Sequence, residues 1–210
     1  MVAEVTKEMQ QGDVKLNDYF DRIAVINLDR RTDRFISFQS QAKDLGIDFV
    51  RYSAIDAQVL GISPMNACRQ SHHRVLTDAA ADNVQRLLIL EDDVEFRQNF
   101  SQDFARLSSV LPDDWQMFYL GSSSLSPVDI GIEGLWKSNT ALTTHAYGVK
   151  AELFDALIQA SSDERYPIDL TYSDLHPKLQ VYACWPSLIG QMASFSDIEN
   201  QFVDYQFLII

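Results

Sequence analysis

The sequence contains few cysteines, few basic residues and no long apolar run. Its two cysteines, Cys68 and Cys184, make neither a disulfide framework nor a zinc site. No segment approaches the roughly 20 consecutive apolar residues of a membrane-spanning helix. The 17 lysines and arginines are outnumbered by 30 aspartates and glutamates, and the net charge of −13 argues against binding nucleic acid or anionic lipid through the overall field. We therefore expect neither a nucleic-acid partner nor a transmembrane segment.

The composition is nevertheless that of a folded protein. Hydrophobic residues make up 46% of the 210 residues, which is enough for a substantial core. Residues 1–18 are polar and lack the apolar centre of a signal peptide, so we expect a polar N-terminal extension there, a single domain over 19–210 and a cytoplasmic location. The apolar chain end at 207–210 is expected to dock on the core or on a partner.

Segments with strand-like and helix-like patterns alternate along the chain. Short apolar runs typical of strands occupy 23–28, 49–55, 86–90, 117–120, 145–149 and 181–185. Apolar residues at helical spacing occupy 34–45, 66–81, 100–110 and 151–160. This order predicts an α/β fold with a mostly parallel central sheet flanked by helices on both faces. Residues 121–138 lack a period and are rich in Ser and Gly, which predicts a long loop acting as a lid or substrate wall.

The apolar run at 87–90 leads directly into three acidic residues, Glu91, Asp92 and Asp93. At the C-terminal end of a buried strand, these carboxylates would lie at the edge of the sheet where open α/β folds bind ligands. Clustered like charges raise one another's pKa, and a divalent cation that prefers oxygen ligands, such as Mg²⁺ or Mn²⁺, is the simplest partner. If the segment is extended, Glu91 and Asp93 point to one side and Asp92 to the other. The alternative is a solvated acidic loop.

Three arginines follow the first predicted strand, where a helix should begin. Cations are unfavourable at the positive end of a helix dipole, so Arg30, Arg31 and Arg34 favour an anion such as phosphate at this position. The alternative is a solvated turn in which the arginines pair with Asp29 and Asp33.

Other polar residues are candidates for binding or proton transfer. Neighbouring His72 and His73 project about 100° apart on a helix, so at most one of them faces a site, and His72 is the stronger candidate. Asp169 or Asp174 is a candidate general base, although either can also be a helix cap. His145 is a weaker candidate for the base.

The order of these segments resembles glycosyltransferase family 25. The segments are INLDRRTDR, RYSAIDA, the SH of CRQSHH, LLILEDDVEF, LPDDWQMFYLG, TTHAYGV, PID and WPSLIGQ. The resemblance covers roughly residues 22–198. Members of this family include bacterial lipooligosaccharide β-1,4-galactosyltransferases, which act in lipopolysaccharide biosynthesis, and collagen hydroxylysine galactosyltransferases. Two departures are Ala67 where Gly is frequent before Cys68, and Ala57 where Gly is usual after Asp56.

The resemblance implies a GT-A fold, which is a nucleotide-binding α/β sandwich with a metal-binding acidic motif. It also implies a UDP-sugar donor, commonly UDP-galactose, and inversion at the anomeric carbon. In this sequence Glu91 and Asp93 correspond to the acidic motif, with Asp93 as the direct ligand of Mn²⁺ or Mg²⁺. Asp92 would lie near the donor ribose or sugar and take part in catalysis.

The same resemblance places Asn27, Arg30 and Arg34 beside the uridine and diphosphate, and His72 with the donor site. We expect the acceptor to be a glycan or lipid-linked sugar, with Asp169 as the base that takes the acceptor's proton.

Two other function classes stay open. One is another metal-dependent α/β enzyme acting on phosphates, such as a phosphatase or nucleotidyltransferase; a nucleophilic phosphatase would need its Asp at the end of the first strand, where Asp29 is a poor match. The other is a non-catalytic interaction module that keeps the fold.

Overall fold

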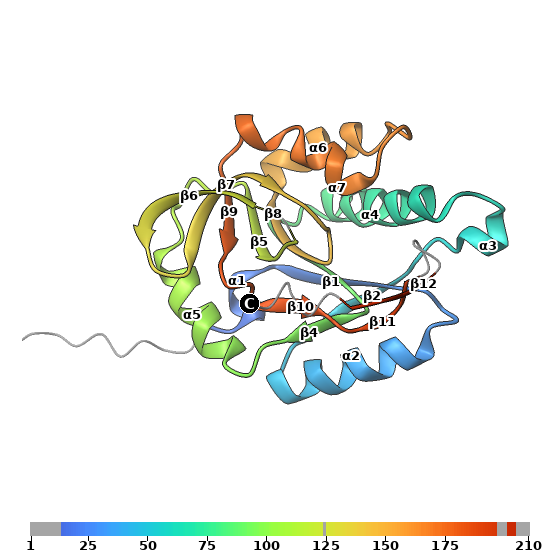
Figure 1. Ribbon diagram of the computed structural model, residues 1–210, viewed down its shortest axis with the longest axis horizontal. Helices are drawn as coiled ribbons and strands as arrows, with labels where there is room; N and C mark the ends of the chain where they lie inside the picture. The colour runs from blue at the N-terminus through green and yellow to red at the C-terminus, as the bar shows by residue number, and fades with distance from the viewer. Residues whose placement is uncertain (1–13, 124, 197–200, 205–210) are drawn as a thin grey trace, which may run out of the picture.

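The computed structural model describes residues 14–123, 125–196 and 201–204, and its centre is an eight-stranded mixed sheet (Figure 1). The strand order is β2-β1-β3-β8-β5-β9-β7-β6. Six of these eight strands point in one direction, and only β8 and β7 are reversed. The strands are β1 (Arg22–Asn27), β2 (Val50–Ser53), β3 (Arg86–Glu91), β5 (Met117–Gly121), β6 (Leu125–Ile132), β7 (Leu135–Ala141), β8 (Ala146–Lys150) and β9 (Val181–Cys184).

Helices cover both faces of the sheet and create two apolar cores. On one face, α2 (Thr32–Leu45) and α5 (Phe100–Val110) contribute buried residues to the first core, as does Leu16 of the short α1 (Leu16–Tyr19). On the other face, α4 (Pro64–Ala81), α6 (Phe154–Ala160) and α7 (Ile168–Ser173) form the second core. Figure 1 shows α2 and the α4–α6–α7 layer on opposite sides of the sheet. The predicted α/β layering is confirmed.

The predicted helices form where local signals agree. In α5, Phe100, Phe104 and Leu107 fall on one buried stripe, as the sequence spacing predicts. The helix α2 ends at Gly46, whose φ of 65° suits a residue without a Cβ. The helix α4 begins after Ser63, whose side chain accepts a hydrogen bond from the backbone N–H of Asn66.

The prediction of a long loop over 121–138 is wrong. This region forms β6 and most of β7, an antiparallel hairpin at the edge of the sheet. Its burial pattern has no period of two because the pairing register shifts at two bulges, and buried positions in β7 fall at Leu135, Ser138 and Ala141. Pro127 is tolerated because β6 is an edge strand.

Two short elements bring a distant segment to the end of β3. The strand β4 (Val94–Phe96) follows β3 after a two-residue turn, and β10 (Ile189–Gln191) pairs with it so that Gln191 lies opposite Val94. The remaining elements are α3 (Ala57–Leu60), η1 (Ala151–Leu153), η2 (His176–Lys178), β11 (Ser194–Ser196) and β12 (Gln201–Val203). This arrangement places the C-terminal part of the chain beside the acidic turn.

Two expectations about the chain ends remain predictions. The apolar segment 207–210 lies outside the described residues, as does most of the extension 1–18. Within the described part of that extension, Leu16 is buried in the first core. In the part of the chain that the structure describes, no helix combines the length and apolar character needed to cross a membrane.

Candidate functional site

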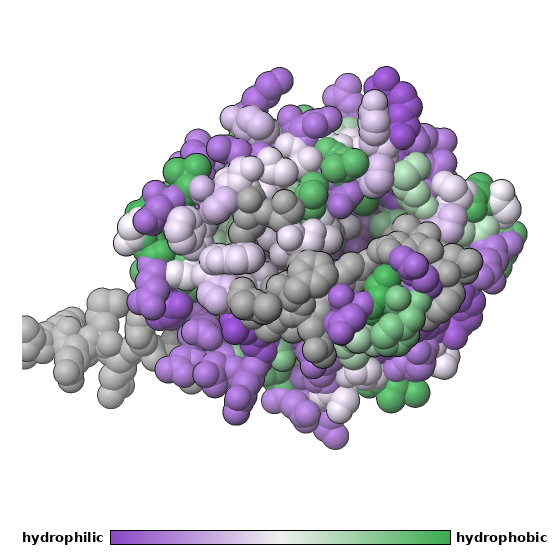
Figure 2. Space-filling view, in the orientation of Figure 1, coloured by the Kyte–Doolittle hydropathy of each residue, from purple (hydrophilic) through white to green (hydrophobic). Residues whose placement is uncertain are grey.

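A cavity of about 390 Å³ lies beside the C-terminal ends of β1 and β3. This volume is within the usual range for small-molecule sites. Figure 2 shows a hollow on this face of the molecule, below α6 and α7 in the view of Figure 1. Seven of the residues expected at the site line the cavity: Arg30, Arg34, His72, Glu91, Asp92, Asp93 and Asp169. The structure therefore brings together residues that are up to 139 positions apart in the sequence (169 − 30).

The acidic turn is organised around Arg34. The strand β3 ends at Glu91, so Asp92 and Asp93 lie in a turn, and the side-to-side alternation expected of an extended segment does not reach them. The Nη1 atom of Arg34 lies 3.2 Å from Asp92 Oδ1 and 2.9 Å from Asp93 Oδ2. Asn27, at the end of β1, donates from Nδ2 to Asp92 Oδ2 at 2.6 Å.

Burial changes the acidity of this cluster. Asp93 is 7% exposed, and burial together with the charge of Glu91 raises its pKa to about 7. Burial also raises the pKa of Asp92, although Asn27 and Arg34 oppose this shift. Near neutral pH Asp93 is therefore partly protonated, whereas an ordinary aspartate is fully ionised.

Glu91 faces a different set of partners. Its Oε1 accepts a hydrogen bond from Thr144 Oγ1 at 3.1 Å and lies 3.4 Å from His72 Nε2. Burial acts to raise the pKa of Glu91, but the contacts from His72 and Thr144 and the nearby His145 outweigh it and lower this pKa. The Glu91 carboxyl is thus more acidic than that of Asp93, because its pKa is lowered whereas that of Asp93 is raised.

The arginines after β1 divide into two groups. Arg31 pairs with Asp33 at 3.0 Å, as the alternative of a solvated turn predicts. Arg30 and Arg34 instead line the cavity, with Arg30 held 2.9 Å from Asp56. Asn27 is 1% exposed and does not line the cavity, so it positions Asp92 from behind.

Asp169 lies on the wall of the cavity formed by α7. Its Oδ1 accepts from the N–H of Leu170 at 2.8 Å and its Oδ2 from the N–H of Thr143 at 3.2 Å. Thr143 has a φ of 68°, which is unfavourable for a β-branched residue, and such strain clusters at functional sites.

The two other candidate bases are placed less favourably. His145 is fully buried and does not line the cavity. Its Nδ1 lies 2.9 Å from Thr143 Oγ1 and its Nε2 lies 3.2 Å from the carbonyl of Ile189, so both ring nitrogens have partners. Asp174 is exposed at the C-terminal end of α7 and does not line the cavity. Asp169 is thus the candidate base with access to a bound molecule.

Comparison with known proteins relates this chain to one protein family. Residues 63–128 match the family model described as glycosyltransferase family 25 (LPS biosynthesis protein). The resemblance to glycosyltransferase family 25 is confirmed. Among relatives of that family, inactive glycosyltransferase 25 family member 3 of Mus musculus is 25% identical over 144 residues, covering 55% of this chain and 24% of the relative.

Two further family 25 relatives show the same pattern. Procollagen galactosyltransferase 2 of Homo sapiens is 25% identical over 129 residues, which cover 49% of this chain and 21% of that protein. A glycosyltransferase 25 family member of Anopheles gambiae is 28% identical over 184 residues, which cover 72% of this chain and 29% of that protein. The chain thus matches less than a third of the length of these three relatives.

The fold has a counterpart among solved structures. A glycosyltransferase involved in the glycosylation of the major capsid of PBCV-1 superposes with a TM-score of 0.50 and 11% identity, covering 85% of this chain and 96% of that chain. At this identity the likeness concerns the fold alone. The GT-A-like α/β fold expected from the family 25 resemblance is confirmed.

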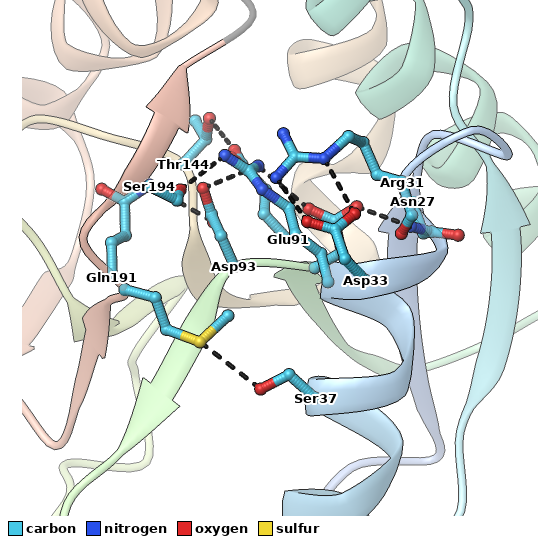
Figure 3. Close-up of polar contacts among 12 residues, drawn as sticks. Asn27, Arg31, Asp33, Ser37, Glu91, Asp93, Thr144, Gln191 and Ser194 are labelled. Carbon is cyan, nitrogen blue, oxygen red and sulfur yellow. Dashed lines mark hydrogen bonds and ion pairs between the residues drawn. The ribbon is translucent and has the colours of Figure 1, made fainter. Parts of the chain in front are cut away.

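Gln191 is a site residue to which the sequence pattern assigned no role. It ends the WPSLIGQ segment of the family 25 resemblance, and the β4–β10 pairing brings its Nε2 to 3.5 Å from Asp93 Oδ1 (Figure 3). Its Oε1 is buried and has no hydrogen-bond partner among the described residues. Buried carboxylates beside an unsatisfied amide oxygen fit a divalent cation that prefers oxygen ligands.

Proposed function

We propose that this protein is a metal-dependent inverting glycosyltransferase. It would move a sugar, with galactose as the first candidate, from a UDP-sugar to a hydroxyl of a glycan or lipid-linked acceptor. One observation carries the proposal: a single cavity contains two arginines, an acidic turn and a separate carboxylate, Asp169. Transfer from a nucleotide sugar needs these three functions, which are binding of the diphosphate, neutralisation of the leaving group and removal of the acceptor's proton.

The arginines would bind the donor, and Asn27 would position a residue that contacts it. Guanidinium groups bind phosphate through paired hydrogen bonds, and Arg30 and Arg34 present them at the start of α2, where the helix dipole also favours an anion. Asn27 fixes Asp92 in place for contact with the donor ribose or sugar. His72 lines the same cavity and would contact the donor from α4.

Asp93, with Glu91 in support, would hold Mn²⁺ or Mg²⁺, and Gln191 Oε1 is a further candidate ligand. Such a cation, when bound, stabilises the negative charge of a departing nucleoside diphosphate. Arg34 now contacts Asp92 and Asp93, so it would exchange these carboxylates for phosphate oxygens when a donor binds.

Asp169 would act on the acceptor. The acceptor oxygen forms a bond to the anomeric carbon while the bond from that carbon to the phosphate oxygen breaks, and the hydroxyl proton passes to a carboxylate oxygen of Asp169. The hydrogen bonds from Thr143 and Leu170 hold this carboxylate in one orientation. Attack from the face opposite the leaving group inverts the anomeric configuration.

A second function is a module that binds nucleotide sugars without turnover. Its specific support is the name of the Mus musculus relative, which describes an inactive family member. In that case the donor subsite would persist while the role of Asp169 would be lost.

Calorimetry with UDP tests the proposal. We expect UDP to bind in the presence of Mn²⁺ and to bind at least 10-fold more weakly with EDTA, because the diphosphate then lacks its counter-charge. Asp93→Ala should reproduce the effect of EDTA, whereas Asp103→Ala, a change of a half-buried acid on α5, should not. Binding of UDP that ignores both Mn²⁺ and Asp93→Ala would contradict the proposed cation site.

A further inference from the structure

Three potential metal ligands of mixed chemistry meet at the wall of the cavity. Cys68 and His72 are four residues apart on α4 and therefore project from the same face of this helix. Glu91 ends the neighbouring strand β3. One ligand atom from each of these residues lies within 4.8 Å of the other two. Ligands of a tetrahedral zinc ion lie roughly 3.5 Å apart, so small side-chain rotations would close the cluster.

His72 is oriented as metal-binding histidines usually are. Its ring is 1% exposed, and its Nδ1 lies 3.1 Å from the hydroxyl of Tyr147, whose ring stacks on it at a centroid distance of 5.8 Å. Its Nε2 is buried, has no hydrogen-bond partner among the described residues and lies 3.4 Å from Glu91 Oε1. A histidine that ligates a metal commonly has its second nitrogen fixed in this way.

Glu91 also has a supporting contact. Thr144 donates a hydrogen bond to Glu91 Oε1 at 3.1 Å and so holds the carboxylate beside His72. Cys68, His72 and Glu91 all line the cavity, which leaves space for a fourth ligand such as water.

The chemistry of this cluster differs from that of the acidic turn. A thiolate and an imidazole select a softer ion such as Zn²⁺ or Co²⁺, whereas Mg²⁺ prefers oxygen ligands alone. Too few cysteines are present for a site built from cysteines, but one cysteine with a histidine and a carboxylate supplies the three protein ligands of an open zinc site.

We propose that Cys68, His72 and Glu91 bind a zinc-class transition metal ion, at a site that shares only Glu91 with the proposed oxygen-ligand site of Asp93. Binding forms bonds from the ion to Sγ, Nε2 and a carboxylate oxygen, and the thiol releases its proton to solvent. Because Glu91 belongs to both sites, an ion bound here competes with its support of Asp93.

Cobalt titration of the full chain, without nucleotide, tests this site. Co²⁺ bound to a thiolate absorbs in the near ultraviolet, and we expect this band to saturate at one ion per chain. Cys68→Ser should abolish the band, and His72→Gln should weaken Co²⁺ binding at least 10-fold. Excess Zn²⁺ should remove the band, whereas excess Mg²⁺ should not.

Cys184→Ala is the matched control, because Cys184 is the other cysteine and is buried in the opposite core. We expect this variant to keep the cobalt band. A wild-type protein without the band, a band that survives Cys68→Ser, or a band that disappears in a folded Cys184→Ala protein would overturn the proposal. Since no nucleotide is present, each result is independent of the proposed transferase activity.

Discussion

At the residue scale, the proposed cation site at Asp93 should depend on pH. Its pKa of about 7 means that between pH 4 and 7 the folded protein retains a proton that the unfolded chain has lost, so this group's contribution to stability falls as pH rises through that range. A cation binds the deprotonated carboxylate and must displace the proton below pH 7. We therefore expect Mn²⁺ affinity to increase by about 10-fold from pH 6 to pH 8.

Calorimetric titration with Mn²⁺ at the two pH values measures this change. The variant Asp103→Asn, which removes a half-buried carboxylate on α5, should keep the same pH dependence. Equal affinity of the wild-type protein at pH 6 and pH 8 would show that Asp93 does not exchange a proton for the ion.

Also at the residue scale, Asp169 should matter for turnover rather than for donor binding. Asp169→Asn preserves the shape of the side chain but removes the proton acceptor, so we expect sugar transfer to fall by about 10²–10⁴-fold. Calorimetry should show that the affinity for UDP is unchanged. Asp174→Asn, at the exposed end of the same helix, is the matched control and should transfer at the wild-type rate. Equal turnover of the two variants would remove Asp169 from the role of base.

At the scale of elements, the end of β5 depends on a residue without a side chain. A Cβ at Gly121 would lie far too close to the carbonyl oxygen of Ile189 and to Nε2 of His145. We expect Gly121→Ala to lower the free energy of unfolding by about 3 kcal/mol or more, because a backbone carbonyl cannot move away easily.

Urea unfolding of Gly121→Ala and Gly61→Ala measures the loss of unfolding free energy in each variant. Gly61 has open space around its Cβ position but a φ of 66°, so its replacement should cost about 1 kcal/mol through backbone strain alone. A similar loss of stability in both variants would argue against close packing at the end of β5.

The elements differ in how far the sequence determines them locally. The helix α5 matches its predicted limits because Phe100, Phe104 and Leu107 repeat at helical spacing and Leu111-Pro112 ends the pattern. The hairpin β6–β7 was not predicted because backbone pairing holds it in place: β7 pairs with β9, and β6 pairs with β7. Register shifts within the hairpin also disturb the alternation of its side chains.

The residues of the candidate site also differ in how far the sequence predicts them. Glu91 and Asp93 are recognisable because a buried apolar strand leads directly into them. Gln191 is not, because its contact with Asp93 spans 98 positions and depends on the pairing of β10 with β4. The contact between the strained Thr143 and Asp169 is likewise not recognisable, because it joins residues 26 positions apart.

At the scale of the whole molecule, a buried histidine should make stability depend on pH. His176 is fully buried, accepts a hydrogen bond from the N–H of Ala141 and lies 3.2 Å from the hydroxyl of Tyr119. Burial lowers its pKa to about 4, below the value of 6.5 in an unfolded chain. Its contribution to stability is therefore complete above pH 6.5 and is lost as pH falls towards 4, by of the order of 3 kcal/mol.

Urea unfolding at pH 4.5 and pH 7 measures this contribution. His176→Gln should reduce the difference in stability between the two pH values, whereas His73→Gln, on the partly exposed side of α4, should leave it unchanged. If the difference is the same in the His176→Gln and wild-type proteins, another group controls the acid sensitivity.

For the molecule as a whole, the proposed function requires one cavity to bind a nucleotide sugar with a divalent cation and to transfer the sugar. The most direct test is the release of UDP from a panel of UDP-sugars, measured with Mn²⁺ and with EDTA, in the wild-type and Asp93→Ala proteins. We predict Mn²⁺-dependent release from at least one UDP-sugar, UDP-galactose first, and loss of this release in Asp93→Ala. Absence of release from every UDP-sugar, by a protein that still binds UDP with Mn²⁺, would contradict transfer and identify a non-catalytic binding module.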